Sequence, residues 1–353
     1  MADDSILFST TRLGDIPLAN RIIMAPMTRS RAPGNVPGEL VATYYGQRAG
    51  AGLIVTEGVS PSADGLGYPS IPGLFSPAQV KGWLRVAEAV HAKGGRVVAQ
   101  LMHTGRIAHA SNMGGLPVVG PSAVQAAGQI FTPEGLKAHD VPQALTEAGI
   151  ERIINDYAAA ARNAIEAGLD GVEVHGANGY LPNQFLAPNA NQRTDRWGGS
   201  AENRSRFVLA VLDAARAAIG AGRVGIRLSP GNPYNDIADP NLDETYKYLF
   251  RELGKRDFAY LHLLPTKPGF DVPALAKQLA GAKLILNGGY DRERAEADLA
   301  SGRANGIAWG SAFIANPDLP ERLRRSAALA TPDTATFYGG DAKGYIDYPA
   351  LAA

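Results

Sequence analysis

Short apolar runs recur along the chain, and their residues are apolar almost without interruption. There are eight of them, at residues 21–27, 52–59, 96–103, 171–176, 223–230, 258–265, 283–289 and 306–313. A strand with one face in water alternates apolar and polar residues, whereas near-continuous apolar strands are typical of a parallel sheet covered by helices on both faces. The pattern therefore predicts eight buried parallel strands.

The segments between these runs have the features of helices. Residues 76–95 begin with Ser76 as a predicted N-cap and Pro77 at the first helical position. Residues 145–168 begin with Thr146 as a predicted cap. Eight alternating β and α units predict an α/β fold, a single (β/α)8 TIM barrel, whose active site lies at the carboxyl ends of the strands. An open doubly wound sheet is the alternative, but no G-x-G-x-x-G motif opens a helix after an early strand.

Two segments are additions to this plan. Residues 104–144, after the third strand, are rich in Gly and Pro and too long for an ordinary loop. We interpret them as a capping insertion over the barrel mouth. Residues 6–19 are interpreted as an N-terminal hairpin that closes the barrel bottom. The whole chain, 1–353, is predicted to form one domain.

Composition excludes several kinds of site. Lys and Arg together number 34, as do Asp and Glu, so no net charge favours binding to nucleic acid or to an anionic membrane. The absence of cysteine excludes disulfides, thiolate metal sites, iron–sulfur clusters and cysteine nucleophiles. No apolar run reaches the roughly 18 residues of a membrane span, and the acidic start lacks the apolar core of a signal peptide. We expect a soluble, cytoplasmic protein.

Polar residues and glycines gather at the carboxyl ends of the predicted strands. They are Thr28, Glu57, Gly58, Gln100, His103, His175, Arg227, His262, Asn287, Gly288, Gly289, Gly310 and Ser311. Each could be structural, because strand-end polar groups often complete hydrogen-bond networks and glycines form tight turns. Barrels, however, commonly bind phosphate after the seventh and eighth strands. The glycines at those positions, next to neutral hydrogen-bonding groups, favour a phosphorylated cofactor.

His175, Asn178 and Tyr180 stand close together where the fourth strand ends. His175 and Asn178 could be metal ligands, but the further ligands such a site needs are hard to find in this sequence. Tyr180 could be a core aromatic with a satisfied hydroxyl. From these residues alone, catalysis, packing and metal binding all stay open.

Six segments of the chain, in matching order and over nearly its whole length, resemble the Old Yellow Enzyme family of flavin-dependent ene-reductases. They are NRIIMAPMTRSRA, QLMHTGRIAH, EVHGANGYLPNQFLAPNANQRTDRWGGSAENRSRF, GIRLSP, IANPDL and FYGGDAKGYIDYP. The resemblance implies a (β/α)8 barrel with noncovalent FMN, reduced by NADPH or NADH. The reduced flavin would then reduce an activated C=C bond in small-molecule electrophilic alkenes. The chain could be a monomer or a homodimer.

The resemblance also implies roles for individual residues. Thr28 would contact flavin C4=O, while Gln100 and Arg227 would face N1 and C2=O, where the arginine charge stabilises reduced flavin. Other implied cofactor contacts are Pro26, Met27 and Gly58 around the ring, and Asn287, Gly288, Gly289, Gly310 and Ser311 towards the phosphate.

For the substrate, His175 and Asn178 would donate hydrogen bonds to one oxygen of an enone. Flavin N5 would deliver hydride to the β-carbon, and Tyr180 would protonate the α-carbon from the opposite face. The implied pocket is completed by Tyr68, Met102, Tyr234 and Tyr345.

Three positions depart from the pattern of many relatives. Met102 replaces a tryptophan, which predicts a roomier and less shape-selective pocket. Ser311 replaces an arginine, which predicts weaker phosphate binding unless a Lys or Arg from elsewhere substitutes. Asn178 stands where some members have a second histidine, and both residue types can donate.

Two alternative functions remain at this stage. The same flavin could reduce nitrate esters or nitroaromatic compounds. A flavin-binding protein could also sense redox state without turnover, although an intact Tyr180 argues against this.

Overall fold

Eight parallel strands close into a barrel in the computed structural model, which describes residues 5–266 and 269–352. Around the barrel they are β3 (Ile22–Met24), β4 (Leu53–Val59), β5 (Val97–Leu101), β10 (Gly171–Gly176), β11 (Val224–Leu228), β12 (Tyr260–Leu263), β13 (Leu284–Asn287) and β14 (Gly306–Trp309). Each coincides with one of the eight apolar runs, so the predicted (β/α)8 barrel is confirmed. The predicted 1–353 domain range includes seven residues outside the described segments.

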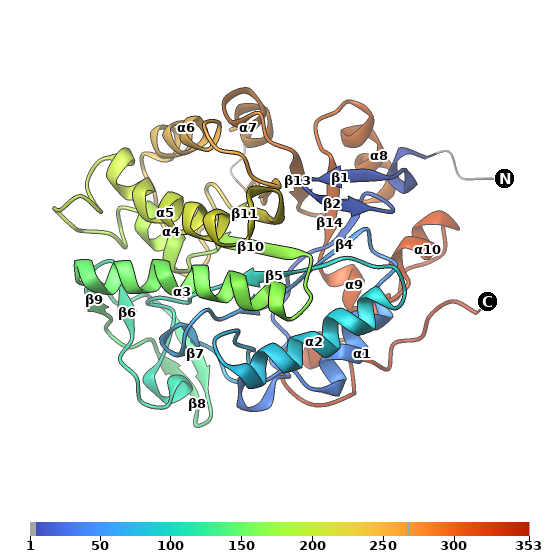
Figure 1. Ribbon diagram of the computed structural model, residues 1–353, viewed down its shortest axis with the longest axis horizontal. Coiled ribbons are helices and arrows are strands. Elements are labelled where there is room, and N and C mark those ends of the chain that lie inside the picture. The colour runs from blue at the N-terminus through green and yellow to red at the C-terminus, as the bar shows by residue number, and fades with distance from the viewer. Residues whose placement is uncertain (1–4, 267–268, 353) are drawn as a thin grey trace.

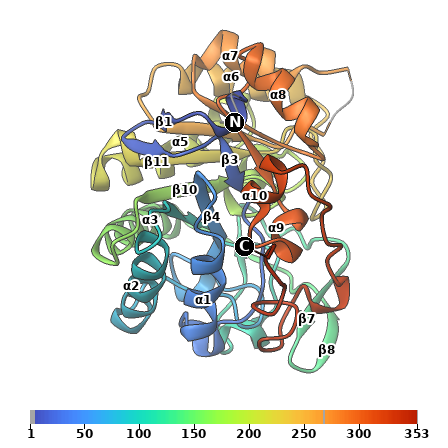
Figure 2. The ribbon, with the colours of Figure 1, turned by 90° about the vertical axis from the view of Figure 1, so that its right-hand side faces the viewer.

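Helices surround the strands, as Figures 1 and 2 show from two directions. They are α1 (Glu39–Gln47), α2 (Pro77–His91), α3 (Glu147–Glu166), α4 (Leu181–Leu186), α5 (Ala201–Ile219), α6 (Leu242–Leu253), α7 (Val272–Ala280), α8 (Arg292–Ala300), α9 (Ser311–Ala315) and α10 (Leu319–Arg324). The predicted caps are confirmed: Ser76 accepts from the Gln79 amide in a capping box, and Thr146 accepts from the Gly149 amide. None of these helices, within the described residues, has the length and apolar character needed to cross a membrane.

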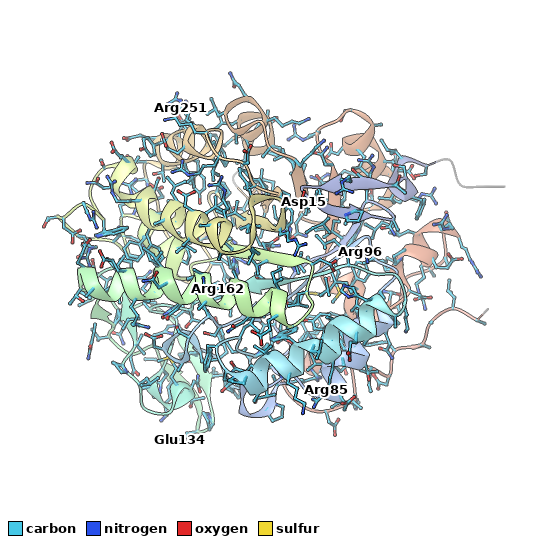
Figure 3. All side chains as sticks on the ribbon, viewed as in Figure 1. Asp15, Arg85, Arg96, Glu134, Arg162 and Arg251 are labelled. Carbon is cyan, nitrogen blue, oxygen red and sulfur yellow. The ribbon has the colours of Figure 1, made fainter. Side chains whose placement is uncertain are left out.

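The outer faces of the helices carry the charges. Arg162 on α3 and Arg251 on α6, both labelled in Figure 3, are exposed. The inner faces bury residues such as Ile153 and Tyr157 of α3, both 0% exposed. This one-sided burial is the reason that these segments form helices packed on a sheet.

An N-terminal hairpin closes one end of the barrel. It consists of β1 (Thr11–Leu13) and β2 (Ile16–Leu18), preceded by the 3-10 turn η1 (Ile6–Phe8). Leu13, Ile16 and Leu18 are buried in one cluster with inward-facing residues of the barrel strands, including Leu53 and Tyr260, which start β4 and β12. The predicted hairpin at the amino-terminal end of the strands is therefore present.

The insertion after β5 covers the opposite end of the barrel. It contains η4 (Ala110–Met113), β6 (Val119–Gly120), β7 (Gln129–Thr132), β8 (Gly135–Ala138) and β9 (Gln143–Ala144). Strands β7 and β8 form a projecting hairpin, visible at the lower left of Figure 1. Residues 129–133 line one cavity together with Tyr180, which follows β10. The insertion thus stands over the barrel mouth, as predicted. Other short turns are η2 (Pro33–Asn35), η3 (Ala63–Gly65), η5 (Ala221–Arg223) and η6 (Thr334–Thr336).

Two buried arginines after β3 hold the C-terminal segment against the barrel mouth. Nε of Arg29 donates to the carbonyl of Phe337 (2.9 Å), and an Nη2 group donates to that of Gly344 (2.8 Å). Arg31 donates to the carbonyls of Thr336 (2.9 Å) and Asp341 (3.0 Å). These bonds satisfy backbone groups of a segment with little regular structure and fix its position next to the site.

Glu57 lies beside these arginines, at a bulge where the β4–β5 register shifts. It is 1% exposed and accepts from the backbone amides of Arg29 (3.1 Å) and Ser30 (3.3 Å), while its Oε1 has no partner in the described part of the chain. Burial raises the pKa of Glu57 to about 7, and those amides together with the arginine charges offset this only in part.

The close packing of the hairpin predicts that a substitution at Gly14 lowers the free energy of unfolding. Its φ is +57°, and a Cβ there would lie 2.3 Å from the carbonyl oxygen of Gly222. Gly94 also has a positive φ, +76°, but a Cβ would meet nothing within 4 Å. We expect Gly94→Ala to cost about 1 kcal/mol of unfolding free energy for backbone strain alone, and Gly14→Ala at least about 2 kcal/mol more, because the hairpin must shift. Urea denaturation measures both; equal losses would contradict the packing described for the hairpin.

A second prediction concerns the pH dependence of stability, which follows from the raised pKa of Glu57. The folded protein keeps a proton that the unfolded chain, with the ordinary pKa of 4.5, has released, so stability falls as the pH rises from about 4.5 to about 7. Glu57→Gln removes this dependence and keeps an acceptor for the two amides. The unfolding free energy of the variant minus that of the wild type should increase by on the order of 2 kcal/mol between pH 5 and pH 8. A difference that does not change with pH would refute the buried, protonated carboxyl.

Candidate functional site

Strand register brings polar residues into two layers at the carboxyl end of the barrel. His175 of β10 pairs with Arg227 of β11, which in turn pairs with His262 of β12. Two residues earlier on β10, Glu173 pairs with Gln100 of β5. Because alternate residues of a strand point to the same side, Glu173 and His175 share one face of β10. The barrel fold therefore collects side chains from four strands that lie far apart in the sequence.

These side chains form a continuous hydrogen-bond chain. Nε2 of Gln100 donates to Oε1 of Glu173 (2.8 Å), and Nδ1 of His262 lies 2.9 Å from the other carboxylate oxygen. Arg227 reaches Nε2 of His262 (2.9 Å) and donates to Oδ1 of Asn287 (3.0 Å). Since a guanidinium can only donate, Nε2 of His262 must accept, and its Nδ1 carries the proton given to Glu173. His262 is thus neutral and fully bonded.

The pKa values agree with this assignment. Burial, and then the charge of Arg227, lower the pKa of His262. For Glu173 burial acts to raise the pKa, but His262, Arg227 and the Gln100 amide outweigh it, so the pKa is lowered and the carboxylate stays charged. The charge pair of Glu173 and Arg227 is held through His262 rather than by direct contact.

Above this layer is a cavity of about 280 Å³. It is lined by Pro26, Met27, Thr28, Gly58, Gln100, Met102, His175, Asn178, Tyr180, Tyr234, Ser311, Ile314, Phe337 and Tyr338. A second cavity, of about 750 Å³, shares Thr28, Tyr180, Tyr234 and Tyr338 with it and extends to Tyr68 and the β7 strand. Most residues predicted for the cofactor ring and the substrate are therefore brought together around one connected space.

His175, Asn178 and Tyr180 all line the smaller cavity, and Tyr180 also lines the larger one. The rings of His175 and Tyr180 are 4.9 Å apart, edge to face, and the hydroxyls of Tyr180 and Tyr68 are 3.3 Å apart. Burial, and then Arg227, lower the pKa of His175, so the imidazole is neutral at physiological pH. Burial, and then Tyr68, raise the pKa of Tyr180, so its hydroxyl keeps its proton.

Other predicted residues lie outside the cavity lining. Arg227 and Asn287 belong to the hydrogen-bonded layer beneath it. Gly288 and Gly289 form the turn after β13, with φ of +131° and +65°, and Gly310 precedes the cavity-lining Ser311. These glycines leave room at the loop ends, but the residues of neither cavity include them.

The prediction that Tyr345 lines the substrate pocket is wrong. Its ring is completely buried and stacks on that of Tyr44, with 4.2 Å between centroids. The guanidinium groups of Arg29 and Arg31 lie 5.1 and 4.5 Å from the same ring. Tyr345 anchors the C-terminal segment, and Phe337 and Tyr338 are the residues of that segment that reach the cavity.

The sequence did not single out Phe337 and Tyr338 as cavity residues, and it did not indicate the role of Glu173. The first two lie in the segment FYGGDAKGYIDYP, so the signal was present, but which tyrosine faces the cavity depends on how the segment folds back. Glu173 could be inferred only from its spacing of two from His175, which places both on one strand face.

The sequence also gave no indication that Arg294 lies near the predicted phosphate-binding glycines. It lies on the first turn of α8, exposed, and its Nη1 donates to the carbonyl of Gly288 (3.1 Å). Its guanidinium also stands 4.1 Å from the ring centroid of Tyr290. These two contacts hold a positive charge beside the glycine turn after β13.

The residues present fit a flat, hydrogen-bonding cofactor. Gln100 uses its amide nitrogen on Glu173, which leaves its oxygen as an acceptor at the cavity. Nδ1 of His175 and Nε of Arg227 are buried without a partner in the described part of the chain. Buried polar atoms are rarely left unpaired, so these atoms are consistent with a bound group that supplies partners.

Comparisons with known proteins identify the family. The family described as NADH:flavin oxidoreductase / NADH oxidase matches residues 6–329. A solved structure of morphinone reductase in complex with tetrahydroNAD is 47% identical, with a TM-score of 0.94 over 98% of each chain. The Old Yellow Enzyme homologue from Zymomonas mobilis is 40% identical, with a TM-score of 0.95 over 98% of this chain and 99% of that one. A probable flavin mononucleotide-dependent alkene reductase from Leishmania infantum is 40% identical over 98% of this chain and 97% of its own length.

These matches cover nearly the whole barrel, including every strand that contributes to the cavity. The relatives are oxidoreductases, and their descriptions name flavin and nicotinamide compounds. The resemblance seen in the sequence is thereby confirmed. The chain belongs to the Old Yellow Enzyme family of flavin-dependent oxidoreductases.

Proposed function

We propose that this enzyme uses noncovalent FMN and NADPH or NADH to reduce the C=C bond of α,β-unsaturated carbonyl or nitro compounds. The observation that carries the proposal is the meeting of neutral His175, Asn178 and protonated Tyr180 in the lining of one cavity. A binding protein needs no such set of donors. The alkene reductase and morphinone reductase among the relatives support the same class of reaction.

The cofactor would occupy the cavity above the Gln100–Arg227 layer. Thr28, Gln100 and Gly58 line this cavity, and the charge of Arg227 lies beneath it. When bound, FMN would supply the hydride. The guanidinium would stabilise negative charge on the reduced ring from its fixed position, because Asn287 and His262 prevent it from turning away.

The phosphate would lie towards Gly288, Gly289, Gly310 and Ser311. Ser311 offers only a hydroxyl where many relatives have an arginine. Arg294 is proposed to supply the missing charge, since it is already bonded to Gly288 and keeps further N–H groups for an anion.

His175 and Asn178 would bind the substrate oxygen. A neutral imidazole and a carboxamide each have an N–H to donate, and neither loses that capacity as the pH changes near neutrality. Donors fixed in a cavity act where negative charge develops, and losing one from such a site costs about 3 kcal/mol. The substrate would therefore be polarised at its oxygen while the alkene lies over the cofactor.

Tyr180 would complete the reaction by protonating the α-carbon. Its raised pKa keeps the proton in place, and the carbanion or enolate formed by hydride addition is a strong enough base to take it. Tyr68, whose hydroxyl is 3.3 Å away, is placed to share or replenish that proton.

Tyr180→Phe separates the two half-reactions. Reduction of bound flavin by NADPH should be unchanged, whereas reoxidation by 2-cyclohexenone should slow by about 100-fold or more, because general acid catalysis contributes roughly that factor. Anaerobic stopped-flow absorbance measures both steps. Wild-type rates in both steps would show that Tyr180 is not the proton donor. Loss of the reductive step alone would contradict the proposed arrangement.

The phosphate assignment predicts the effect of Arg294→Ala. The dissociation constant for FMN should rise about tenfold, as expected for the loss of one charge-assisted hydrogen bond, and the difference should shrink in high salt. Fluorescence titration of FMN into apoprotein measures the constant. Arg251→Ala, an exposed arginine on α6, is the matched control and should leave the constant unchanged. Equal constants for wild type and Arg294→Ala would refute the assignment.

A further inference from the structure

The orientation of the Asn178 carboxamide decides what it can do in the cavity. With Nδ2 towards the cavity the group donates to a substrate oxygen, and with Oδ1 there it repels that oxygen. The two orientations have almost the same shape, so they are told apart only by the hydrogen bonds around them. The partners of Asn178 therefore determine its chemical role.

One loop, residues 229–236 after β11, contacts Asn178 at three points. The backbone amide of Asn178 donates to Oγ of Ser229 (2.9 Å), and its carbonyl accepts from Nδ2 of Asn235 (2.8 Å). Its side-chain Oδ1 accepts from Nδ2 of Asn232 (2.9 Å). Asn178 has a φ of +57°, in the left-handed region that asparagine tolerates better than most residues. The loop thus fixes both the backbone and the side chain.

A backbone donor resolves the orientation of both amides. The backbone N–H of Tyr234 donates to Oδ1 of Asn232 (3.1 Å), and a backbone N–H cannot accept. The oxygen of Asn232 must therefore face Tyr234, and its nitrogen must face Asn178. The oxygen of Asn178 is then committed to Asn232, which leaves Nδ2 of Asn178 for the cavity.

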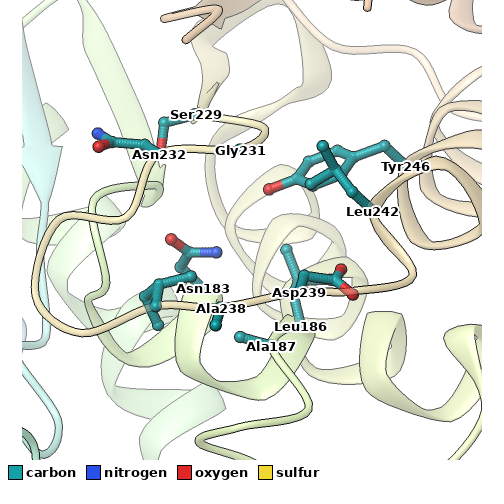
Figure 4. A pocket seen from close by; sticks show the side chains of 11 residues that line it. Asn183, Leu186, Ala187, Ser229, Gly231, Asn232, Ala238, Asp239, Leu242 and Tyr246 are labelled. Atoms are coloured by element: carbon teal, nitrogen blue, oxygen red, sulfur yellow. The ribbon is translucent and has the colours of Figure 1, made fainter. Parts of the chain in front are cut away.

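Asn232 is partly exposed and borders a further cavity beside the loop. This cavity has a volume of about 290 Å³ and is lined by Ser229, Asn232, Asn183 and Tyr246, among others. Figure 4 shows Ser229 and Asn232 on one side of this space, with Asn183 on α4 and Tyr246 on α6 facing it. Beside this open space, the bonds to the Tyr234 amide and to Asn178 hold the Asn232 side chain in place.

We propose that Asn232 is a positioning residue that selects the donor orientation of Asn178 and so allows Asn178 to bind the substrate oxygen. The proposal rests on the function proposed above. It assigns a task to a loop residue that touches neither the reacting atoms nor the first cavity.

Asn232→Asp tests this directly. The carboxylate still accepts from the Tyr234 amide, but it has no N–H for Asn178 and attracts Nδ2 of that residue, which reverses the amide. With FMN bound, 4-chlorophenol serves as a mimic of the enolate, and its binding is followed by the charge-transfer band. The dissociation constant should rise about tenfold or more, as for a lost hydrogen bond to a charged group. Asn232→Ala, which leaves the amide free to take either orientation, should give a smaller rise.

Asn189→Asp is the matched control. Asn189 also bonds the same loop through its amide, donating to the carbonyl of Asp236 (2.8 Å) and accepting from the Ala238 amide (2.9 Å), but no bond joins it to Asn178. It should leave the phenol constant within about twofold. Urea unfolding of each variant checks that the loop change has not altered the fold.

Two readouts separate positioning from a general structural effect. In an Asn178→Gly background, where glycine accepts the positive φ, Asn232→Asp should change the constant less than about twofold. As the pH falls, the introduced carboxyl becomes protonated and can donate to Asn178 again. The ratio of the variant and wild-type constants, in which phenol ionisation cancels, should therefore approach one.

The outcomes are distinct. A wild type that shows the band and an Asn232→Asp variant that binds the phenol equally well overturn the inference alone. An undiminished loss in the Asn178→Gly background overturns it as well. A flavin-loaded wild type that gives no band overturns the proposed function, and this inference with it.

Discussion

A buried chain of hydrogen bonds across the barrel, from Gln100 through Glu173 and His262 to Arg227, is the interaction on which the site depends. A carboxylate and a guanidinium removed from water are costly unless hydrogen-bond partners offset the loss of solvation. Strand register supplies the partners, because Glu173 lies opposite Gln100 and Arg227 lies between His175 and His262. The closed barrel thus makes a fixed positive charge possible beneath the cavity, and that charge also helps to keep His175 neutral.

The groups above this layer are held by bonds from side chains to backbone rather than by regular structure. Arg29 and Arg31 fix the segment that carries Phe337 and Tyr338, and the 229–236 loop fixes Asn178. Prearranged donors need not reorganise during a reaction. Such fixed donors are usually the largest contribution to the stabilisation of developing charge in enzymes. The same burial that fixes these groups sets their protonation, with a neutral imidazole at His175 and a retained proton on Tyr180.

The sequence was sufficient where the determining interactions are local or repeated. Near-continuous apolar runs predicted all eight strands, and the caps at Ser76 and Thr146 were correct because a capping bond spans only three residues. The strand-end residues were brought together because a barrel gathers strand ends. The prediction for Tyr345 was wrong because its environment joins segments about 300 residues apart. The ring stacks on Tyr44 and lies close to Arg29 and Arg31. Asn232 could not be foreseen, since its task depends on how an irregular loop meets the turn at Asn178.

The most direct test of the proposed chemistry is an anaerobic visible spectrum of the purified protein, taken before and after NADPH and again after 2-cyclohexenone. We expect a flavin spectrum that bleaches with NADPH and returns in full with the enone, because the cavity lining would hold the cofactor and supply the donors for the acceptor. A protein that gains no flavin band when FMN is added, or whose bleached flavin stays bleached with every enone or nitroalkene tried, would contradict the proposed chemistry.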